Sequence, residues 1–238
     1  MSTDAIETTT YSKYSLSSMI QFSNYQKYFG PQLIVDIPAL DLAQGIYWLK
    51  GENGSGKTTL IKSIAGLIPF EGNISVAATD IKQNRTKYRD IVNYAEAEPL
   101  YPSFLTGSDL VRFYTKTKKA SDQQVATLIK SFGVQDYIDN KIGTYSSGMA
   151  KKLSLVLGFI GNPTLILLDE PLITLDVASV KTLQDLIVEH YSAGASFLVT
   201  SHQDLLNGLI AKMAQEPGGN ATQPVVHQFR KLTFTRLT

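Results

Sequence analysis

The chain has 238 residues, of which 43% are hydrophobic and 18% charged, and its formal net charge is +1 at pH 7. This length fits one large domain or a core with an inserted subdomain. The near-neutral charge gives no support for a nucleic-acid-binding protein that works through a broad basic field, and the lack of cysteine excludes disulfide frameworks and thiolate metal sites.

Residues 1–18 are polar and rich in hydroxyl side chains, without the basic start and apolar stretch of a secretory signal. We predict a disordered tail over 1–18 and a single domain over 19–238. No apolar run approaches the roughly 18 residues that are needed to span a bilayer. We therefore expect a soluble protein without direct membrane insertion, whose membrane role, if it has one, comes through a partner.

The first half of the domain shows strand patterns around one glycine-rich loop. Residues 19–42 indicate two strands broken by a turn at 29–32, and residues 45–50 indicate a buried strand. A loop over 51–56 precedes a helix that begins at Lys57 and is stopped by Gly66 and Pro69. Further strands are predicted at 73–79 and 90–96.

The second half begins with a helical block. Helices are predicted at 108–117, 121–133 and 148–160, and the second of them opens with a capping box of Ser121 and Gln124. A strand at 164–169, a helix at 179–194 and a strand at 196–201 follow. This order predicts an α/β fold of the P-loop NTPase type with a mostly parallel core sheet, an N-terminal antiparallel β subdomain and a small α-helical subdomain inserted over about 99–160.

The loop between the third predicted strand and the first helix, GENGSGKTT, matches the phosphate-loop pattern G-x-x-x-x-G-K-[ST]. Its backbone N–H groups form an anion-binding nest, which needs residues without Cβ obstruction, and the following helix points its positive dipole end at the same place. Lys57 supplies a mobile charge to the β- and γ-phosphates of ATP, and the Thr58 hydroxyl binds Mg²⁺. The residues assigned to the nucleotide are Gly51, Asn53, Gly54, Ser55, Gly56, Lys57, Thr58 and Thr59. The alternative is a glycine-rich turn with a solvated lysine.

A second motif, TLILLDEP at 164–171, is an apolar strand that ends in two adjacent acids. A strand buried on both faces reads as a continuous apolar run, and ligands of such sheets bind beyond the carboxyl ends of the strands. We assign Asp169 to Mg²⁺ and Glu170 to polarising the water that attacks the γ-phosphate. A solvated start of a loop is the alternative.

Three further segments, YSSGM at 145–149, PLITLD at 171–176 and FLVTSHQD at 197–204, complete a specific order. With them the chain resembles the ATP-binding cassette (ABC) family from about residue 19 to the 210s. The signature of that family is Leu-Ser-Gly-Gly-Gln, and YSSGM stands in its place. The resemblance implies that Ser146, Ser147 and Gly148 form a second phosphate site at the start of a helix.

The resemblance implies a head-to-tail dimer with two ATPs between the partners, because one phosphate loop per chain cannot close both sides of one ATP. It places Asp176 at the dimer interface and His202 against the γ-phosphate as a catalytic residue with Glu170 and Lys57; a structural role is the alternative for His202. Tyr28 or Phe29 lies where the family stacks an aromatic ring on adenine. The choice between these two stays open, and both could be core residues.

One position departs from the family, which usually places a metal-reaching glutamine before the helical insert. An alignment on Pro99 puts Ala97 there, flanked by Glu96 and Glu98. Either Glu96 substitutes as an acidic ligand or the contact is lost. The departure concerns coupling to a membrane partner and leaves nucleotide binding untouched.

The expected function is Mg²⁺-dependent ATP hydrolysis that powers transport through a separate transmembrane permease subunit of the exporter type. The second ATPase subunit of the dimer is an identical chain or a paralogue, and no nucleic-acid partner is expected. The expected location is cytoplasmic, at the inner face of the cell membrane. Two alternatives stay open: a ribosome- or DNA-associated ABC ATPase, and a regulatory cassette with weak turnover.

Overall fold

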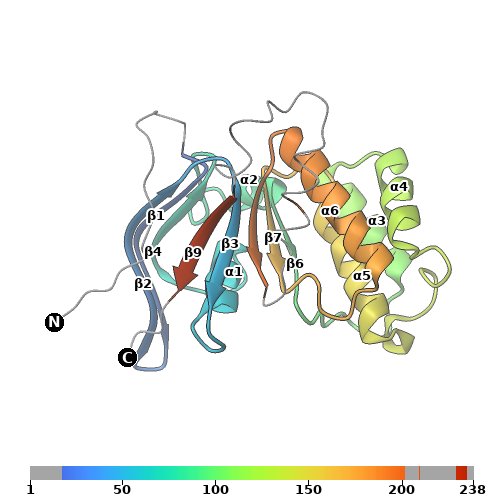
Figure 1. Ribbon diagram of the computed structural model, residues 1–238, viewed down its shortest axis with the longest axis horizontal. Helices are drawn as coiled ribbons and strands as arrows, with labels where there is room; N and C mark the ends of the chain where they lie inside the picture. The colour runs from blue at the N-terminus through green and yellow to red at the C-terminus, as the bar shows by residue number, and fades with distance from the viewer. Residues whose placement is uncertain (1–17, 202–208, 210–228, 235–238) are drawn as a thin grey trace.

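The structure is a computed structural model in which residues 18–201, 209 and 229–234 are described (Figure 1). The expected tail, apart from Ser18, and His202 lie outside the described residues. The elements in chain order are β1 (Ile20–Phe29), β2 (Gln32–Leu42), β3 (Ile46–Gly51), α1 (Lys57–Ile64), β4 (Glu71–Val76), β5 (Thr79–Asp80), α2 (Arg85–Ile91), β6 (Val92–Ala95), α3 (Gly107–Lys118), α4 (Asp122–Phe132), a 3₁₀ turn (Ile142–Thr144), α5 (Ser147–Phe159), β7 (Leu165–Asp169), α6 (Val177–Ser192), β8 (Ser196–Thr200) and β9 (Phe229–Phe234).

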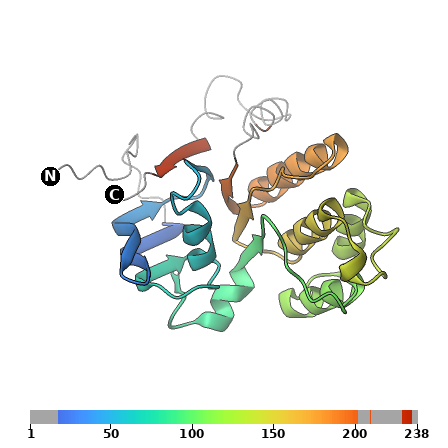
Figure 2. The same cartoon turned by 90° about the horizontal axis from the view of Figure 1, so that it is seen from below.

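Two sheets build the molecule, and they confirm the predicted mixed architecture. The first is antiparallel with strand order β2-β1-β4-β5, and the second is parallel with order β6-β7-β8-β3-β9. Figures 1 and 2 show helices α3, α4, α5 and α6 gathered beside the parallel sheet, on the side away from the antiparallel sheet. Among the described helices, none is long and apolar enough to cross a bilayer.

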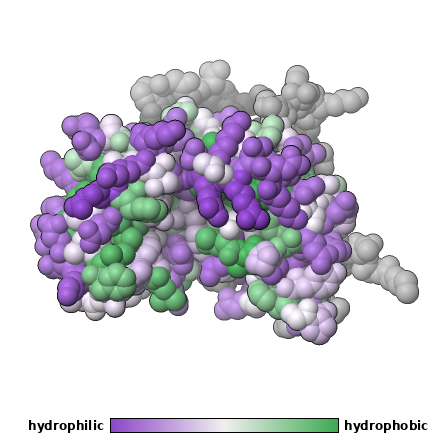
Figure 3. All heavy atoms as spheres, turned by 180° about the vertical axis from the view of Figure 1, so that it is seen from behind, coloured by the Kyte–Doolittle hydropathy of each residue, from purple (hydrophilic) through white to green (hydrophobic). Residues whose placement is uncertain are grey.

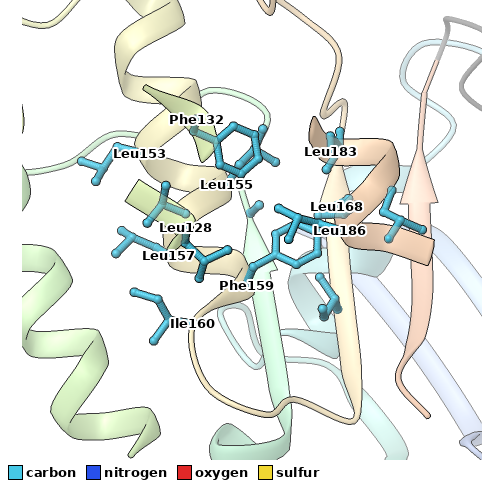
Figure 4. Close-up of a cluster of buried hydrophobic side chains, with 14 of the residues drawn as sticks. Leu128, Phe132, Leu153, Leu155, Leu157, Phe159, Ile160, Leu168, Leu183 and Leu186 are labelled. Carbon is cyan, nitrogen blue, oxygen red and sulfur yellow. The ribbon is translucent and has the colours of Figure 1, made fainter. Parts of the chain in front are cut away.

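Strand β7 illustrates why the parallel sheet forms where the apolar runs predicted it. All five of its residues are buried, and side chains of a strand alternate between its two faces. Leu165 and Leu167 belong to a core shared with α1 and the antiparallel sheet, whereas Ile166 and Leu168 belong to a core shared with the helices. In Figure 4 the side chains of Leu153, Leu155, Leu157 and Phe159 from α5 lie among those of α4, α6 and Leu168. A strand with two buried faces holds its carboxyl end in a fixed position.

Helix α1 lies between the two sheets. Leu60, Ile61 and Ile64 are buried in the same core as Tyr25 of β1 and Tyr47 of β3. The Tyr25 hydroxyl donates to Ser63 Oγ (2.8 Å), which ties the antiparallel sheet to this helix. The packing therefore fixes the position of α1, and with it the loop that precedes the helix.

Two predicted strands needed correction, and one helix had not been predicted. The predicted strand 73–79 ends at Val76, because Ala77 and Ala78 form a turn with positive φ values of 45° and 57°. The predicted strand 90–96 begins at Val92, after the unpredicted helix α2. That helix has seven residues and one buried side chain, Tyr88, whose hydroxyl donates to Ile64 O (2.7 Å), so its sequence carries almost no helical periodicity.

The predicted capping box of α4 is half present. Ser121 Oγ accepts from the N–H of Gln124 (3.2 Å), as expected. The Gln124 side chain does not return to Ser121 and instead bonds to the backbone of Gly161. Gln124 Nε2 donates to the carbonyl oxygen of Gly161 (2.7 Å), and the Gly161 N–H donates to Gln124 Oε1 (3.0 Å). A tertiary contact with the end of α5 thus replaces the local one.

Candidate functional site

The loop between β3 and α1 has the backbone that the phosphate-loop pattern predicts. Gly54 and Gly56 have φ values of 77° and 103°, in the left-handed region that favours glycine. A Cβ added to Gly54 would meet nothing within 4 Å, so the loop faces open space there. Gly56 is the N-cap of α1, and within the described part of the chain no side chain caps this helix. Its first N–H groups are thus left for a ligand.

Two polar side chains are enclosed by this loop. Lys57 is 8% exposed, and its Nζ donates to the carbonyl oxygens of Gly51 (2.7 Å) and Glu52 (2.9 Å). Ser55 is 2% exposed, and its Oγ has no hydrogen-bond partner among the described residues. Buried polar groups are almost always paired, so a buried hydroxyl without a partner fits a loop that closes around a hydrogen-bonding ligand such as a phosphate.

Asp169 lies at the carboxyl end of β7 and collects hydroxyl groups from three other elements. Its Oδ1 accepts from Thr200 Oγ1 of β8 (2.6 Å) and Thr58 Oγ1 of α1 (3.2 Å), and its Oδ2 accepts from the Tyr94 hydroxyl of β6 (3.4 Å). Burial, and then the charge of Asp169, raises the pKa of Tyr94, so the phenol stays a protonated donor. The phosphate loop and the acidic strand end therefore meet in one place.

These groups fit a Mg²⁺ ion that is shared with a substrate. Among the described residues, no group of three or more His, Cys, Asp or Glu side chains could hold a metal ion. Thr58 and Asp169 offer one hydroxyl and one carboxylate, which are oxygen ligands of the kind Mg²⁺ takes together with substrate phosphates and water. The set is incomplete without phosphate, as expected for a site of this kind.

Glu170 follows Asp169 in a sharp turn. Its φ is 43°, a left-handed conformation that costs a non-glycine residue on the order of 1–3 kcal/mol. The turn is stabilised because the Glu170 N–H donates to both Thr200 O (3.1 Å) and Thr200 Oγ1 (2.9 Å). The backbone thus holds an acidic side chain directly beyond the strand that carries Asp169.

The second predicted phosphate site, Ser146 to Gly148, opens α5. Ser146 Oγ accepts from the N–H of Met149 (3.2 Å), and Ser146 and Ser147 are exposed. A Cβ added to Gly148 would lie 3.1 Å from Thr174 O, in the turn that precedes α6. Figures 1 and 2 both show the beginning of α5 well away from α1, so one chain does not bring the two sites together.

Asp176 joins this region from the start of α6. Its carboxylate caps the helix by accepting from the N–H of Ser179 (2.7 Å) and pairs with Lys152 Nζ of α5 (2.5 Å). The bond to Lys152 and the cap together lower the pKa of Asp176 to about 2. Asp176 therefore links the turn before α6 to α5.

The two aromatic candidates for adenine stacking differ in exposure. Phe29 is 55% exposed, and Lys27 Nζ lies 4.9 Å from the centroid of its ring, so Phe29 is not a core residue. Tyr28 is half-buried, and its hydroxyl donates to Gln26 Oε1 (3.2 Å). Stacking on adenine stays a prediction for either residue.

A lysine at the centre of the site was not predicted from the motifs. Lys151 of α5 is 1% exposed, and its Nζ donates to the carbonyl oxygens of Glu96 (2.7 Å), Asp169 (3.0 Å) and Ala97 (3.2 Å). Burial lowers its pKa to about 8, although nearby carboxylates favour the charged form. A signal was present, because Lys151 shares the i, i+3, i+7 spacing of the buried residues Ser154 and Gly158.

Residues 96–97, which stand in place of the usual glutamine, are held by hydrogen bonds to their backbone. The Glu96 N–H donates to Ser154 Oγ (3.1 Å), and the carbonyl oxygens of Glu96 and Ala97 accept from Lys151. Burial raises the pKa of the Glu96 carboxyl group, and the charge of Asp169 acts in the same direction. The methyl group of Ala97 has no atom that could bind a metal ion.

Comparisons with known proteins give similar proteins of one family. The profile of one family, described as ABC transporter, matches residues 39–173. The chain is 35% identical to the cytochrome c biogenesis ATP-binding export protein CcmA of Legionella pneumophila (strain Lens) over 68% of this chain and 82% of that protein. It is 29% identical to an uncharacterized ABC transporter ATP-binding protein, YybJ of Bacillus subtilis (strain 168), over 77% of this chain and 85% of that protein. A solved ATP-binding subunit of an ABC transporter superimposes with a TM-score of 0.72 at 23% identity, covering 82% of each chain.

Proposed function

Because the chain belongs to the ABC transporter family, whose ATP-binding subunits are ATPases, we propose that it powers transport through a separate transmembrane subunit. It works as a dimer with two ATPs between the subunits. One observation carries this proposal. The start of α1, which follows Gly56, contacts Asp169, because Thr58 donates to the Asp169 carboxylate.

The residues of the phosphate loop have distinct parts in binding. The uncapped N–H groups of α1 and the hydroxyl of Ser55 donate to phosphate oxygens, and the dipole of α1 favours their charge. Lys57 exchanges the carbonyl oxygens of Gly51 and Glu52 for the β- and γ-phosphates. When bound, Mg²⁺ would be held by Thr58 and Asp169 and would neutralise charge on the phosphates.

Hydrolysis requires a proton acceptor for the attacking water. We assign this role to Glu170, and two observations support it: Glu170 follows Asp169 directly, and its backbone is held in a turn bonded to Thr200. The strained backbone of Glu170 is of the kind that collects at functional sites. His202, which lies outside the described residues, is proposed to contact the γ-phosphate as well.

A second chain supplies the other half of each ATP site. Ser146, Ser147 and Gly148 lie at the start of α5, where both serines are exposed, far from the phosphate loop of the same chain. A helix start of this kind is an anion-binding site. In a head-to-tail dimer the α5 start of one chain faces the phosphate loop of the other, with Asp176 at the interface.

The surface supports a membrane partner. Leu100, Phe104 and Phe113 are 91%, 72% and 64% exposed, in α3 and the segment before it. Figure 3 shows hydrophobic side chains on the helical half of one face, and others on the same face toward the sheets. Exposed apolar patches of this kind mark protein interaction sites. We place the protein at the inner face of the membrane through this partner, and the similarity to an export protein supports transport outward.

The proposal is tested by purifying the chain together with membrane proteins from its native source. We expect a multi-span membrane protein to co-purify and Mg²⁺-dependent ATPase activity to rise in the complex. Purification with ribosomes or DNA instead would favour a non-transport ABC ATPase. ATP binding without turnover in the complex would favour a regulatory cassette.

A further inference from the structure

A buried lysine on α5 joins three segments around the ATP site. Its Nζ reaches the backbone of Asp169 at the end of β7 and that of Glu96 and Ala97 beyond β6. Lysine is almost never fully buried unless it is paired, and Lys151 is 1% exposed. All three of its donors are used, so its position is defined by these carbonyl groups.

The same helix holds β6 along most of its length. Asn93 Nδ2 donates to the carbonyl oxygens of Gly158 and Ile160 (2.9 Å each), and Ser154 accepts from the Glu96 N–H. Of these residues of α5, Lys151 lies nearest to the start of the helix. Among the bonds named here for the described residues, only those of Lys151 also reach β7. It therefore connects the helix that opens at Ser146 with the strand that ends in Asp169.

The charge of Lys151 matters as well as its reach. The carboxylates of Asp169, Glu170, Glu96 and Glu98 all act on it. A cation among four carboxylates limits their mutual repulsion, and without it three backbone carbonyls would lose a charged donor. Removal of the amino group would thus loosen the positions of the acids and of residues 96–97 together.

We propose that Lys151 is a positioning residue, which holds the Asp169–Glu170 turn at a fixed place relative to the start of α5 so that Glu170 meets its water. This inference rests on the proposed ATPase function. Lys151 acts through Glu170 and has no contact with the phosphate loop among its described bonds, so it serves turnover and not nucleotide affinity.

The variant Lys151→Met removes the charge and the three donors while filling the space. We expect kcat to fall about 10²-fold, because a displacement of about 1 Å in a catalytic group has an effect of that size. The affinity for labelled ATP should stay within about threefold of the wild type, since Lys57 and the loop are untouched.

Lys118 offers a matched control. It is half-buried, and burial lowers its pKa to about 8. Its Nζ donates to the carbonyl oxygens of Arg89 in α2 and of Val92, the first residue of β6. Lys118→Met therefore removes a comparable lysine that holds β6 but lies away from Asp169. Its turnover should stay within about twofold of the wild type at a similar loss of thermal stability.

The experiment measures kcat, KM, ATP affinity and thermal stability for both variants in the full chain, and repeats Lys151→Met in a Glu170→Gln background. A residue that acts through Glu170 should have little further effect there, because the two losses are then not additive. Equal turnover of Lys151→Met and Lys118→Met, or a full additional loss in the Glu170→Gln background, would overturn the inference.

If Lys151→Met does not fold, Lys151→Gln, which has a shorter reach, is measured in the same way with the same expected pattern. A wild-type chain without ATP hydrolysis would instead count against the proposed function.

Discussion

Helices α1 and α5 both begin at a predicted phosphate site, but their first turns are built differently. Helix α1 starts at a left-handed glycine without a side-chain cap, next to the enclosed side chains of Lys57 and Ser55. Helix α5 starts at Ser146, whose hydroxyl already caps the N–H of Met149, and its first residues are exposed. The α1 end therefore leaves its N–H groups for a ligand inside an enclosed loop, whereas the α5 end is capped by its own serine and lies at the surface, where we propose that a second chain meets it. Four predictions test this difference, from the largest expected effect to the smallest.

The chemistry at the α1 end should depend on Glu170. Glu170→Gln keeps the shape of the side chain but removes the proton acceptor, and we expect turnover to fall about 10²–10⁴-fold. ATP affinity should be nearly unchanged. Steady-state hydrolysis and a titration with labelled ATP measure both, with Glu189→Gln on the exposed face of α6 as a control. A Glu170→Gln protein with more than half of the wild-type turnover would exclude this role.

The α5 end should matter only for the dimer. In a Glu170→Gln background, ATP should accumulate a dimer that size-exclusion chromatography with light scattering detects. Adding Gly148→Asp places a carboxylate against the γ-phosphate, and like-charge contact of this kind costs several kcal/mol, so the dimer should be lost. ATP binding to the phosphate loop of the monomer should survive.

Gly148→Ala is the matched control for that variant. It adds the same Cβ beside Thr174 O, at 3.1 Å, without a charge. We expect the alanine variant to form the ATP-dependent dimer. Loss of the dimer in both variants would show that steric crowding by the added Cβ, and not the charge, prevents dimerisation. A dimer in both variants would contradict a two-chain site.

Binding at the α1 end should depend on Lys57. Lys57→Ala removes a charge-assisted contact with phosphate of roughly 1.5–3 kcal/mol, which corresponds to about tenfold weaker ATP binding or more. The titration with labelled ATP decides this, with Lys62→Ala on the same helix as the control. Equal affinities of Lys57→Ala and the wild type would contradict the assignment of this loop to the phosphates of ATP.

The smallest effect concerns the pair between Asp176 and Lys152 that links α5 to α6. The folded-state pKa of Asp176 is lowered from 3.8 to about 2, so its contribution to stability is present above pH 3.8 and is lost as the pH falls through 2. Asp176→Asn keeps the cap but not the ion pair, and we expect a loss of at most about 1 kcal/mol for so exposed a pair. Urea unfolding at pH 6 and pH 2 measures it. A difference between the two proteins that persists at pH 2 would contradict the ion-pair account.

The sequence by itself determined the elements whose signal is local. The apolar run before Asp169, the glycine pattern of residues 51–58 and the serine before α5 each predict a structure within a few residues, and the described elements confirm the strands and helix starts there. Periodicity and backbone conformation are properties of neighbouring residues, which is why these predictions succeed without a fold. The roles of the side chains at the site remain predictions.

Only the tertiary structure decided which distant groups meet at the site. The strand order β6-β7-β8-β3 brings Tyr94 and Thr200 to Asp169, and the packing of α5 on β6 and β7 buries Lys151 among backbone carbonyls. The same packing draws Gln124 away from its local cap to Gly161. These bonds join residues between 18 and 75 positions apart. Their partners are chosen by how sheets and helices stack, which no local pattern of residues encodes.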